Sequence, residues 1–308
     1  MSQIVESFPL NIIDEMKLFY KAVLTPAPNG AIFRAKTNNC VITGYRSGKV
    51  LFQGTTPMEE AQKWGKHAKH SHMKVAKSDV GPFHPPESLY TSYHIGSDEA
   101  GTGDYFGPIT VGAVYVTPAT GEKLKRSGIK DSKSLSDKRI QELANEIIAL
   151  KVPYSLLVLS NEKYNTLQKR GWTQGKMKSI MHHHAIKTLL KKVEDQPLEG
   201  ILIDQFCEPS IYKRHVHSEN ESLPRGLYFK TKAESHSIAV AAGSILARTR
   251  FVQEMERLSK KVGFELPKGA SKKVDQSAAE IIHKHGPDYL ATCAKVHFAN
   301  THKAEHYL

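Results

Sequence analysis

Cysteine is scarce in this sequence, and its three copies form no pair. Cys40, Cys207 and Cys293 lie far apart, without the C-x-x-C spacing of metal-binding and redox motifs. The scarcity argues against a disulfide-stabilised extracellular scaffold and against a thiolate zinc site. We therefore expect a protein of the reducing cytoplasm.

Long apolar runs are also missing. The longest candidate, residues 237–247, is short and rich in alanine, and Gly243 and Ser244 interrupt it. Near the N-terminus, Glu6 and Asp14 stand where a secretory signal would place basic residues and then an apolar run. We expect neither a membrane span nor export.

Acidic residues are outnumbered: 43 Lys and Arg face 31 Asp and Glu, which gives a net charge of +12 and a pI near 9.4. This excess favours a polyanionic partner, because phosphate contacts release counterions. Simple solubility is the alternative explanation. A G-x-x-x-x-G-K nucleotide loop is missing as well, since no lysine follows the glycines of residues 96–107. The combination indicates a nucleic acid and disfavours a hydrolysed nucleotide.

Residues 1–70 are predicted to form a small unit. A helical period covers residues 11–24, and strands are predicted at residues 31–36, 40–46 and 49–53. Alternation along the first strand places Arg34 and Lys36 on one face, and Arg46 ends the second strand. A basic sheet face is a candidate nucleic-acid platform, and an ordinary solvated face is the alternative.

Two further segments follow this unit. Residues 71–90 are predicted to be a linker, because they are basic and polar and contain Pro82, Pro85 and Pro86. Residues 91–308 alternate strand and helix patterns, which predicts a larger α/β domain. With 40% hydrophobic residues, the chain can bury a sizeable core.

Four carboxylates at the edges of predicted elements are the strongest functional signal. They are Asp98, Glu99, Asp204 and Glu234. The first two follow an apolar strand, the third ends the strand at residues 198–204, and the fourth lies in the first turn of a helix predicted at residues 233–261. Singly, an acid in a first helical turn complements the helix dipole, and the third can be a loop acid. Only the combination indicates a site.

Asp98 and Glu99 can share a site only if the strand ends between them, because successive strand residues face opposite sides. We therefore expect the strand to stop at Asp98 and Glu99 to lie in a turn permitted by Gly101 and Gly103. Main-chain N–H and C=O groups of such a turn can contact a sugar or a phosphate.

Carboxylates without histidine or cysteine suit Mg²⁺ or Mn²⁺. Two such ions can activate a water and stabilise the leaving oxygen of an in-line phosphoryl displacement. Without a cation, the clustered acids would raise one another's pKa. Lys133 in Asp131-Ser132-Lys133 is a candidate phosphate contact, and a solvated loop lysine is the alternative.

Taken together, these motifs resemble the bacterial type 2 ribonucleases H, and among them the ribonuclease HIII family. The matching segments are residues 96–103, 106–108, 131–135, 203–204, 232–235, 237–239 and 244–248, with 30–33 and 47–54 in the small unit. Glu234 stands where the HII type uses aspartate, and Thr102 where it usually has arginine. The resemblance covers nearly the whole chain.

The resemblance implies an α/β fold, an RNase H-like mixed sheet flanked by helices, preceded by a small α+β TATA-binding-protein-like domain. It implies endonucleolytic hydrolysis of the RNA strand of RNA/DNA hybrids by a two-metal-ion mechanism, leaving 5′-phosphate and 3′-hydroxyl ends. The four acids would be the catalytic ligands of two Mg²⁺ or Mn²⁺ ions. The residues expected to contact substrate are Gly101, Thr102, Gly103, Lys133, Ser134, Arg34, Lys36 and Arg46.

The expected partner is an RNA/DNA hybrid duplex, and nothing in the sequence demands more than a monomer. Two other functions fit the same residues. A DNA nuclease or resolvase on a related fold would use the same metals and would cleave DNA duplex. A non-catalytic nucleic-acid binder would bind without metal and without turnover.

Overall fold

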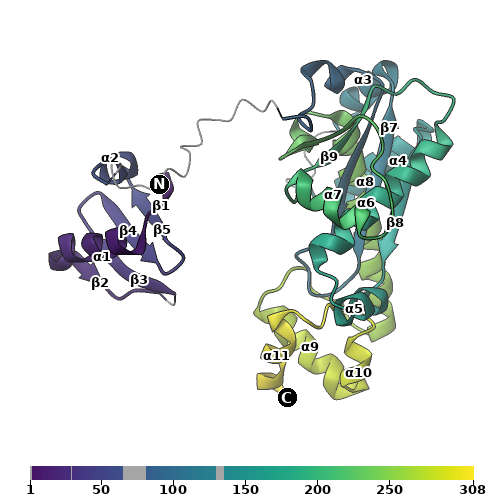
Figure 1. Ribbon diagram of the computed structural model, residues 1–308. Helices are drawn as coiled ribbons and strands as arrows, with labels where there is room; N and C mark the ends of the chain where they lie inside the picture. The colour runs from purple at the N-terminus through teal and green to yellow at the C-terminus, as the bar shows by residue number, and fades with distance from the viewer. Residues whose placement is uncertain (1, 29, 65–80, 130–134) are drawn as a thin grey trace. The chain divides into compact units, whose positions relative to one another are not determined.

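The computed structural model divides the chain into two compact units, residues 1–79 and 80–308 (Figure 1). It describes residues 2–28, 30–64, 81–129 and 135–308.

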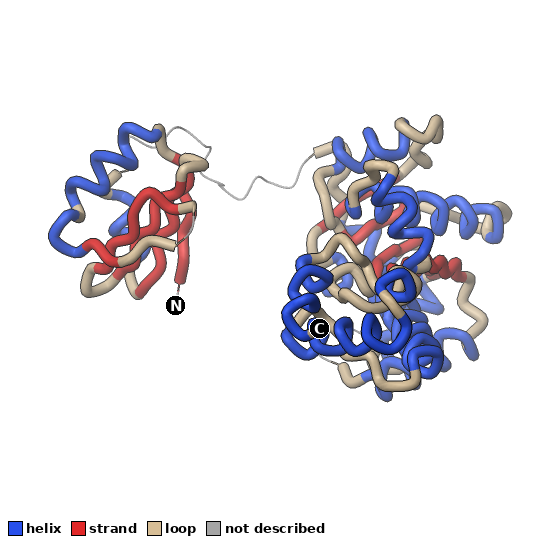
Figure 2. The backbone as a smooth tube through the Cα atoms, turned by 90° about the horizontal axis from the view of Figure 1, so that it is seen from below, coloured by secondary structure: helices blue, strands red, loops and turns tan. Residues whose placement is uncertain are grey.

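The smaller unit is a five-stranded antiparallel sheet with the strand order β1-β5-β4-β3-β2. Its elements are β1 (Ser2–Ser7), α1 (Leu10–Phe19), η1 (Lys21–Val23), β2 (Leu24–Thr25), β3 (Ala31–Lys36), β4 (Cys40–Tyr45), β5 (Lys49–Gly54) and α2 (Pro57–Gln62). Both α-helices pack on one face of the sheet, where Ile13, Phe33 and Phe52 are buried (Figure 2). The opposite face carries exposed Arg34 and Lys36, as the alternation along β3 predicts.

The larger unit is built on a mixed sheet with the order β10-β9-β6-β7-β8. Its strands are β6 (His94–Ala100), β7 (Ile109–Val116), β8 (Tyr154–Leu159), β9 (Gly200–Asp204) and β10 (Leu227–Lys230). β6, β7 and β8 are antiparallel, whereas β9 runs parallel to both β6 and β10. This is the mixed sheet that the resemblance to the ribonucleases H implied.

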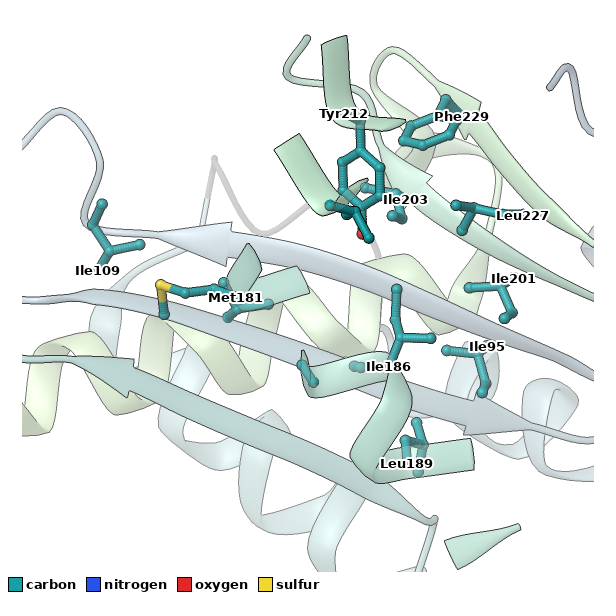
Figure 3. Close-up of a cluster of buried hydrophobic side chains, with 14 of the residues drawn as sticks. Ile95, Ile109, Met181, Ile186, Leu189, Ile201, Ile203, Tyr212, Leu227 and Phe229 are labelled. Carbon is teal, nitrogen blue, oxygen red and sulfur yellow. The ribbon is translucent and has the colours of Figure 1, made fainter. Parts of the chain in front are cut away.

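The larger unit also contains helices that cover both faces of this sheet and a C-terminal group of helices that pack with one another and with the end of the longest helix. They are η2 (Glu87–Thr91), α3 (Pro118–Arg126), α4 (Asp137–Ala149), α5 (Asn161–Lys169), α6 (Gln174–Lys192), α7 (Pro209–His217), η4 (Ala233–Ser235), α8 (Ile238–Val262), α9 (Lys272–His285), α10 (Pro287–Leu290), α11 (Ala299–Ala304) and η5 (Glu305–Tyr307). Side chains of α6 and α7, such as Ile186 and Tyr212, pack on one face with Ile95 and Ile201 (Figure 3). On the other face, α4 and α8 form a second core with β7.

The helix α8 lies unusually close to β6. A Cβ atom added at Gly96 would come within 2.1 Å of the backbone nitrogen of Val240, so no larger residue fits there without moving the helix. Alanines 239, 241 and 242 line the approach and are buried. One helical turn further along lies Ser244, opposite Asp98, so this close contact positions the site described below.

Two predicted boundaries differ from the structure. Part of the predicted linker, residues 81–90, packs on the larger unit, where Leu89 and Tyr90 join a buried cluster with Leu202 and Val240. The segment packs on the larger unit because apolar side chains such as Phe83 and Leu89 lie among its prolines. The helix predicted from residue 233 begins only at Ile238, because the Ser237 side chain accepts a hydrogen bond from the Val240 N–H and caps it.

Candidate active site

Asp98 and Glu99 lie in a continuous strand and point to opposite faces of the sheet. The pairing of β6 with β7 continues to Ala100 opposite Thr110, so the prediction that the strand stops at Asp98 was wrong. The antiparallel partner keeps the backbone extended beyond the first acid. Asp98 accepts a hydrogen bond from Ser244 of α8, whereas Glu99 faces α6.

Two side chains of α6 hold Glu99. Lys178 Nζ lies 2.7 Å from Oε1 of Glu99, and His182 Nε2 lies 2.9 Å from Oε2. The other ring nitrogen of His182 is 2.8 Å from the hydroxyl of Ser97, and Phe206 stacks on the ring. Lys178 and Glu99 are 12% and 11% exposed, so this is a largely buried ion pair.

Sequence reasoning missed both partners of Glu99. His182 is one of three consecutive histidines, and it is fully buried. The available signal was the spacing of Lys178 and His182, four residues apart, which places them on one face of a helix.

The charges in this region are unbalanced in a way that favours a cation. Burial, followed by the nearby charges of Glu99 and Asp204, raises the pKa of Asp98 to about 8. Burial would also raise the pKa of Glu99, but the hydrogen bond and charge of His182, together with Lys178, hold it below its ordinary value. A cation beside Asp98 would relieve the repulsion that Glu99 and Asp204 impose.

Asp204 lies beside Asp98, near the C-terminal ends of the neighbouring strands β9 and β6. Ser97 pairs with Ile203 in parallel β6 and β9, so the next residues of the two strands are these two acids. The Ala233 N–H donates to Asp204 Oδ1 at 2.9 Å, which ties β9 to the segment that carries the fourth acid.

Glu234 lies in the short turn η4, whereas the sequence predicted that it would lie in the first turn of the long helix α8. Lys232, with φ of 56°, redirects the chain after β10, and the cap at Ser237 starts the helix later. Glu234 is buried, with 4% of its surface exposed. The dipole of α8 therefore does not account for its position.

The oxygen donors fit a hard divalent cation, although their present arrangement is not a closed cage. Among the described residues, no three His, Cys, Asp or Glu side chains are grouped so that they could hold a metal ion. Glu99 contributes to this, because both of its oxygens are engaged by α6. The carboxylates of Asp98, Asp204 and Glu234 remain of the type that Mg²⁺ and Mn²⁺ prefer. Lys133 and Ser134 lie outside the described residues.

The glycine turn after β6 is shaped differently at its two glycines. Gly101 has φ of +85° and no room for a Cβ atom, which would lie 2.2 Å from the Pro108 carbonyl oxygen. Gly103 is exposed, and nothing in the chain lies within 4 Å of an added Cβ. The chain itself therefore requires a glycine at position 101 but not at position 103. The carbonyl of Thr102 between them accepts from Gln174 at 3.0 Å.

The remaining candidates belong to the smaller unit. Arg34 and Lys36 lie on β3, and Arg46 lies in the turn after β4; all three are exposed. Arg34 and Lys36 therefore share the face of the sheet that the helices leave open.

Family models match both units. Residues 95–301 match the model described as Ribonuclease HII, and residues 3–77 match one described as a domain of unknown function, DUF3378. With the mixed sheet and the edge acids, the first match places the larger unit in the class of type 2 ribonucleases H. Within the described residues, no helix is long and apolar enough to cross a membrane.

Similar proteins make the family specific. Ribonuclease HIII of Oceanobacillus iheyensis is 54% identical over 100% of both chains, and that of Bacillus subtilis is 48% identical over 99% of this chain and 97% of its own. The crystal structure of Bst-RNase HIII in complex with Mn²⁺ is 41% identical, covers 99% of this chain and 98% of its own, and superimposes with a TM-score of 0.70. The chain belongs to the ribonuclease HIII family.

Membership of this family defines the activity. The protein is a metal-dependent endoribonuclease that degrades the RNA of RNA/DNA hybrids.

Proposed function

We propose that Asp98, Glu99, Asp204 and Glu234 are the ligands of two Mg²⁺ or Mn²⁺ ions during hydrolysis of the RNA strand. The ions would supply an activated water and charge stabilisation for an in-line displacement that leaves 5′-phosphate and 3′-hydroxyl ends. The observation that supports the assignment is the position of buried Asp98 beside Glu99 and Asp204, because burial and then these two nearby charges raise its pKa to about 8.

The chain's own contribution is to hold these acids in place. Ser244 orients Asp98 from the α8 side, and the Ala233 N–H orients Asp204. Lys178 and His182 fix Glu99 from the opposite side of the sheet. We infer that a cation competes with Lys178 for the carboxylate of Glu99.

We propose that Gly101, Thr102 and Gly103 contact the RNA strand through their main chain. An enzyme specific for hybrids has to recognise 2′-hydroxyls, which are displayed in the minor groove. The support is the open surface at Gly103, where the chain leaves room for a ligand to approach the backbone. Gly101 shapes the turn beneath it.

The small unit is proposed to bind the hybrid independently of cleavage. We assign substrate binding to residues 1–70 and catalysis to residues 91–308, with Arg34, Lys36 and Arg46 contacting phosphates. All three are exposed on the side of the unit that its helices leave open or at the adjacent turn. Lys133 and Ser134 are proposed as further substrate contacts on the basis of the sequence motif alone.

Two broader features complete the proposal. The enzyme acts as a monomer, because a single chain supplies all four acids. It works in the cytoplasm, where its three free cysteines stay reduced.

The deciding experiment measures cleavage of matched RNA/DNA, DNA/DNA and RNA/RNA duplexes in Mg²⁺ or Mn²⁺, with Asp98→Asn as the control. Cleavage of the RNA strand of the hybrid alone, lost in the variant while hybrid binding persists, is the expected result. Normal cleavage by Asp98→Asn would refute the ligand assignment. Cleavage of DNA/DNA would favour a resolvase-like nuclease, and binding without cleavage in either metal would favour a non-catalytic binder.

A further inference from the structure

Lys295 stands out because it is a fully buried lysine that forms no ion pair with any residue that the structure describes. Its exposed fraction is 0%, and no other lysine in the described part of the chain is buried. Its Nζ atom donates to the carbonyl oxygens of Asp104 at 2.7 Å and Gly107 at 2.6 Å. These carbonyls belong to the segment that follows the glycine turn of residues 101–103.

Burying an ammonium group is costly, so its placement needs a compensating interaction. Burial lowers the pKa of Lys295 to about 7, and the carboxylate of Asp104 opposes this only partly. The two hydrogen bonds that Lys295 donates to the carbonyl oxygens of Asp104 and Gly107 compensate for this cost, because they give the buried amino group polar partners. An apolar side chain of the same length would fill the space but could not donate.

Other groups pull the same segment inward. Gln174 donates to the Thr102 carbonyl at 3.0 Å, and Asn161 donates to the Gly107 carbonyl at 2.9 Å. Main-chain bonds add to this: Tyr105 N–H donates to Gly269 at 2.9 Å, and Gly107 N–H donates to Cys293 at 2.9 Å. The segment is therefore anchored from helices α5 and α6 and from the C-terminal part of the chain.

The anchoring leaves one side of the turn available. The carbonyls of residues 102, 104 and 107 are all engaged by side-chain donors. The N–H groups of Thr102 and Gly103 make no hydrogen bond within the part of the chain that the structure describes. Thr102 is half-buried and Gly103 is exposed. Within the described chain, the protein thus engages three carbonyls of the segment and leaves the N–H groups of Thr102 and Gly103 without an acceptor.

We propose that Lys295 and Gln174 are positioning residues that hold the turn of residues 101–107 so that its main-chain N–H groups face the RNA strand. The inference rests on the proposed contact between this turn and the substrate. Neither residue touches the reacting atoms. Their role is to set discrimination between RNA and DNA, and they act on substrate binding more than on turnover.

The test compares the affinities for an RNA/DNA hybrid and a DNA/DNA duplex of the same sequence. Both are measured in the full-length Asp98→Asn protein, which removes cleavage. The Lys295→Met variant in this background should lower the ratio of the two affinities at least tenfold. In the cleaving enzyme, the same change should raise KM at least tenfold and alter kcat less than threefold.

Val274→Ala is the matched control. Val274 is fully buried in the same hydrophobic cluster as Tyr105, but it contributes no hydrogen bond to the turn, so its truncation lowers stability without releasing a carbonyl. The ratio should be unchanged in this variant. An equal fall in Val274→Ala, or no fall in Lys295→Met, would overturn the inference.

Two further outcomes are separable. If the Asp98→Asn parent shows no preference for the hybrid, the proposed role of the turn fails and this inference fails with it. A preference that persists in Lys295→Met refutes only the positioning role. If Lys295→Met does not fold, Gln174→Leu decides, because it removes the donor to Thr102 at a half-buried position. A lower ratio supports the inference, and an unchanged ratio overturns it.

Discussion

Replacing Lys178 with methionine tests whether a cation and a lysine compete for Glu99. The pair is 2.7 Å long and its partners are 12% and 11% exposed, so the change leaves a buried carboxylate with His182 as its remaining partner. Breaking a buried pair from one side costs about 3 kcal/mol. The methionine keeps an apolar stem beside Phe206, whose ring lies 4.1 Å from the lysine nitrogen in the parent.

The cost should depend on divalent metal. A ligand at 100 times its Kd stabilises the folded state by about 2.7 kcal/mol. In the parent protein, a cation at Glu99 must first displace Lys178, whereas in Lys178→Met the carboxylate has no lysine to lose. We therefore expect Mn²⁺ to stabilise the variant more than the parent, recovering at least ~1 kcal/mol of the loss.

The assay is urea unfolding in EDTA and in Mn²⁺. Trp172 belongs to the larger unit and packs on its main core, so a Trp64→Phe background makes its fluorescence report on that unit alone. Lys187→Met is the matched control on the same helix. Lys187 pairs with Glu221 at 2.6 Å, but both are considerably more exposed, so we expect little change and no dependence on metal.

Two results would refute the reasoning. If Lys178→Met loses the same stability in EDTA and in Mn²⁺, the cation does not use Glu99, or does so without displacing the lysine. If it loses no stability in EDTA, the ion pair does not hold Glu99 in solution.

Three other expectations concern stability and binding. Gly96→Ala should lower the free energy of unfolding by roughly 2 kcal/mol or more, because its Cβ would strike the backbone of α8. Gly103→Ala should change the free energy of unfolding by less than ~0.5 kcal/mol and still weaken hybrid binding. Equal losses of stability of the two variants in urea unfolding would contradict this. Burial lowers the pKa of Lys295 from 10.5 to about 7, so between these two pH values the unfolded chain binds the proton more tightly than the folded protein does. The stability of the parent relative to Lys295→Met should therefore rise with pH in this window and stay constant at lower pH. Removing residues 1–79 should weaken hybrid binding and flatten its dependence on salt, and an unchanged slope in a salt titration would rule out the basic platform.

The sequence predicted features correctly where they depend only on the residues of one segment, such as which side chains of a strand are buried. Alternation along residues 31–36 was enough to separate buried Phe33 from exposed Arg34, and the structure agrees. The edge position of Asp204 followed from the apolar strand before it. Such features depend on neighbours in sequence, which a periodic pattern records.

Features that depend on a distant partner were missed. The strand continues through Glu99 because β7 pairs with it, and no residue near Glu99 signals that pairing. The hold that Lys178 and His182 exert on this acid depends on how α6 lies across the sheet. The later start of α8 at Ile238 was visible in principle, since Ser237 is a favourable cap.

The hydrogen bond from the Ala233 N–H to Asp204 gives the site a built-in spectroscopic probe. The resonance of an amide proton shifts with the charge and geometry of the carboxylate that accepts from it. Ala233 is fully buried and its N–H donates directly to Asp204, so its signal would respond to that carboxylate and would be sheltered from solvent. An NMR titration of the Ala233 amide could thus observe Asp204 binding a proton or a metal ion, without a probe on the carboxylates and without substrate.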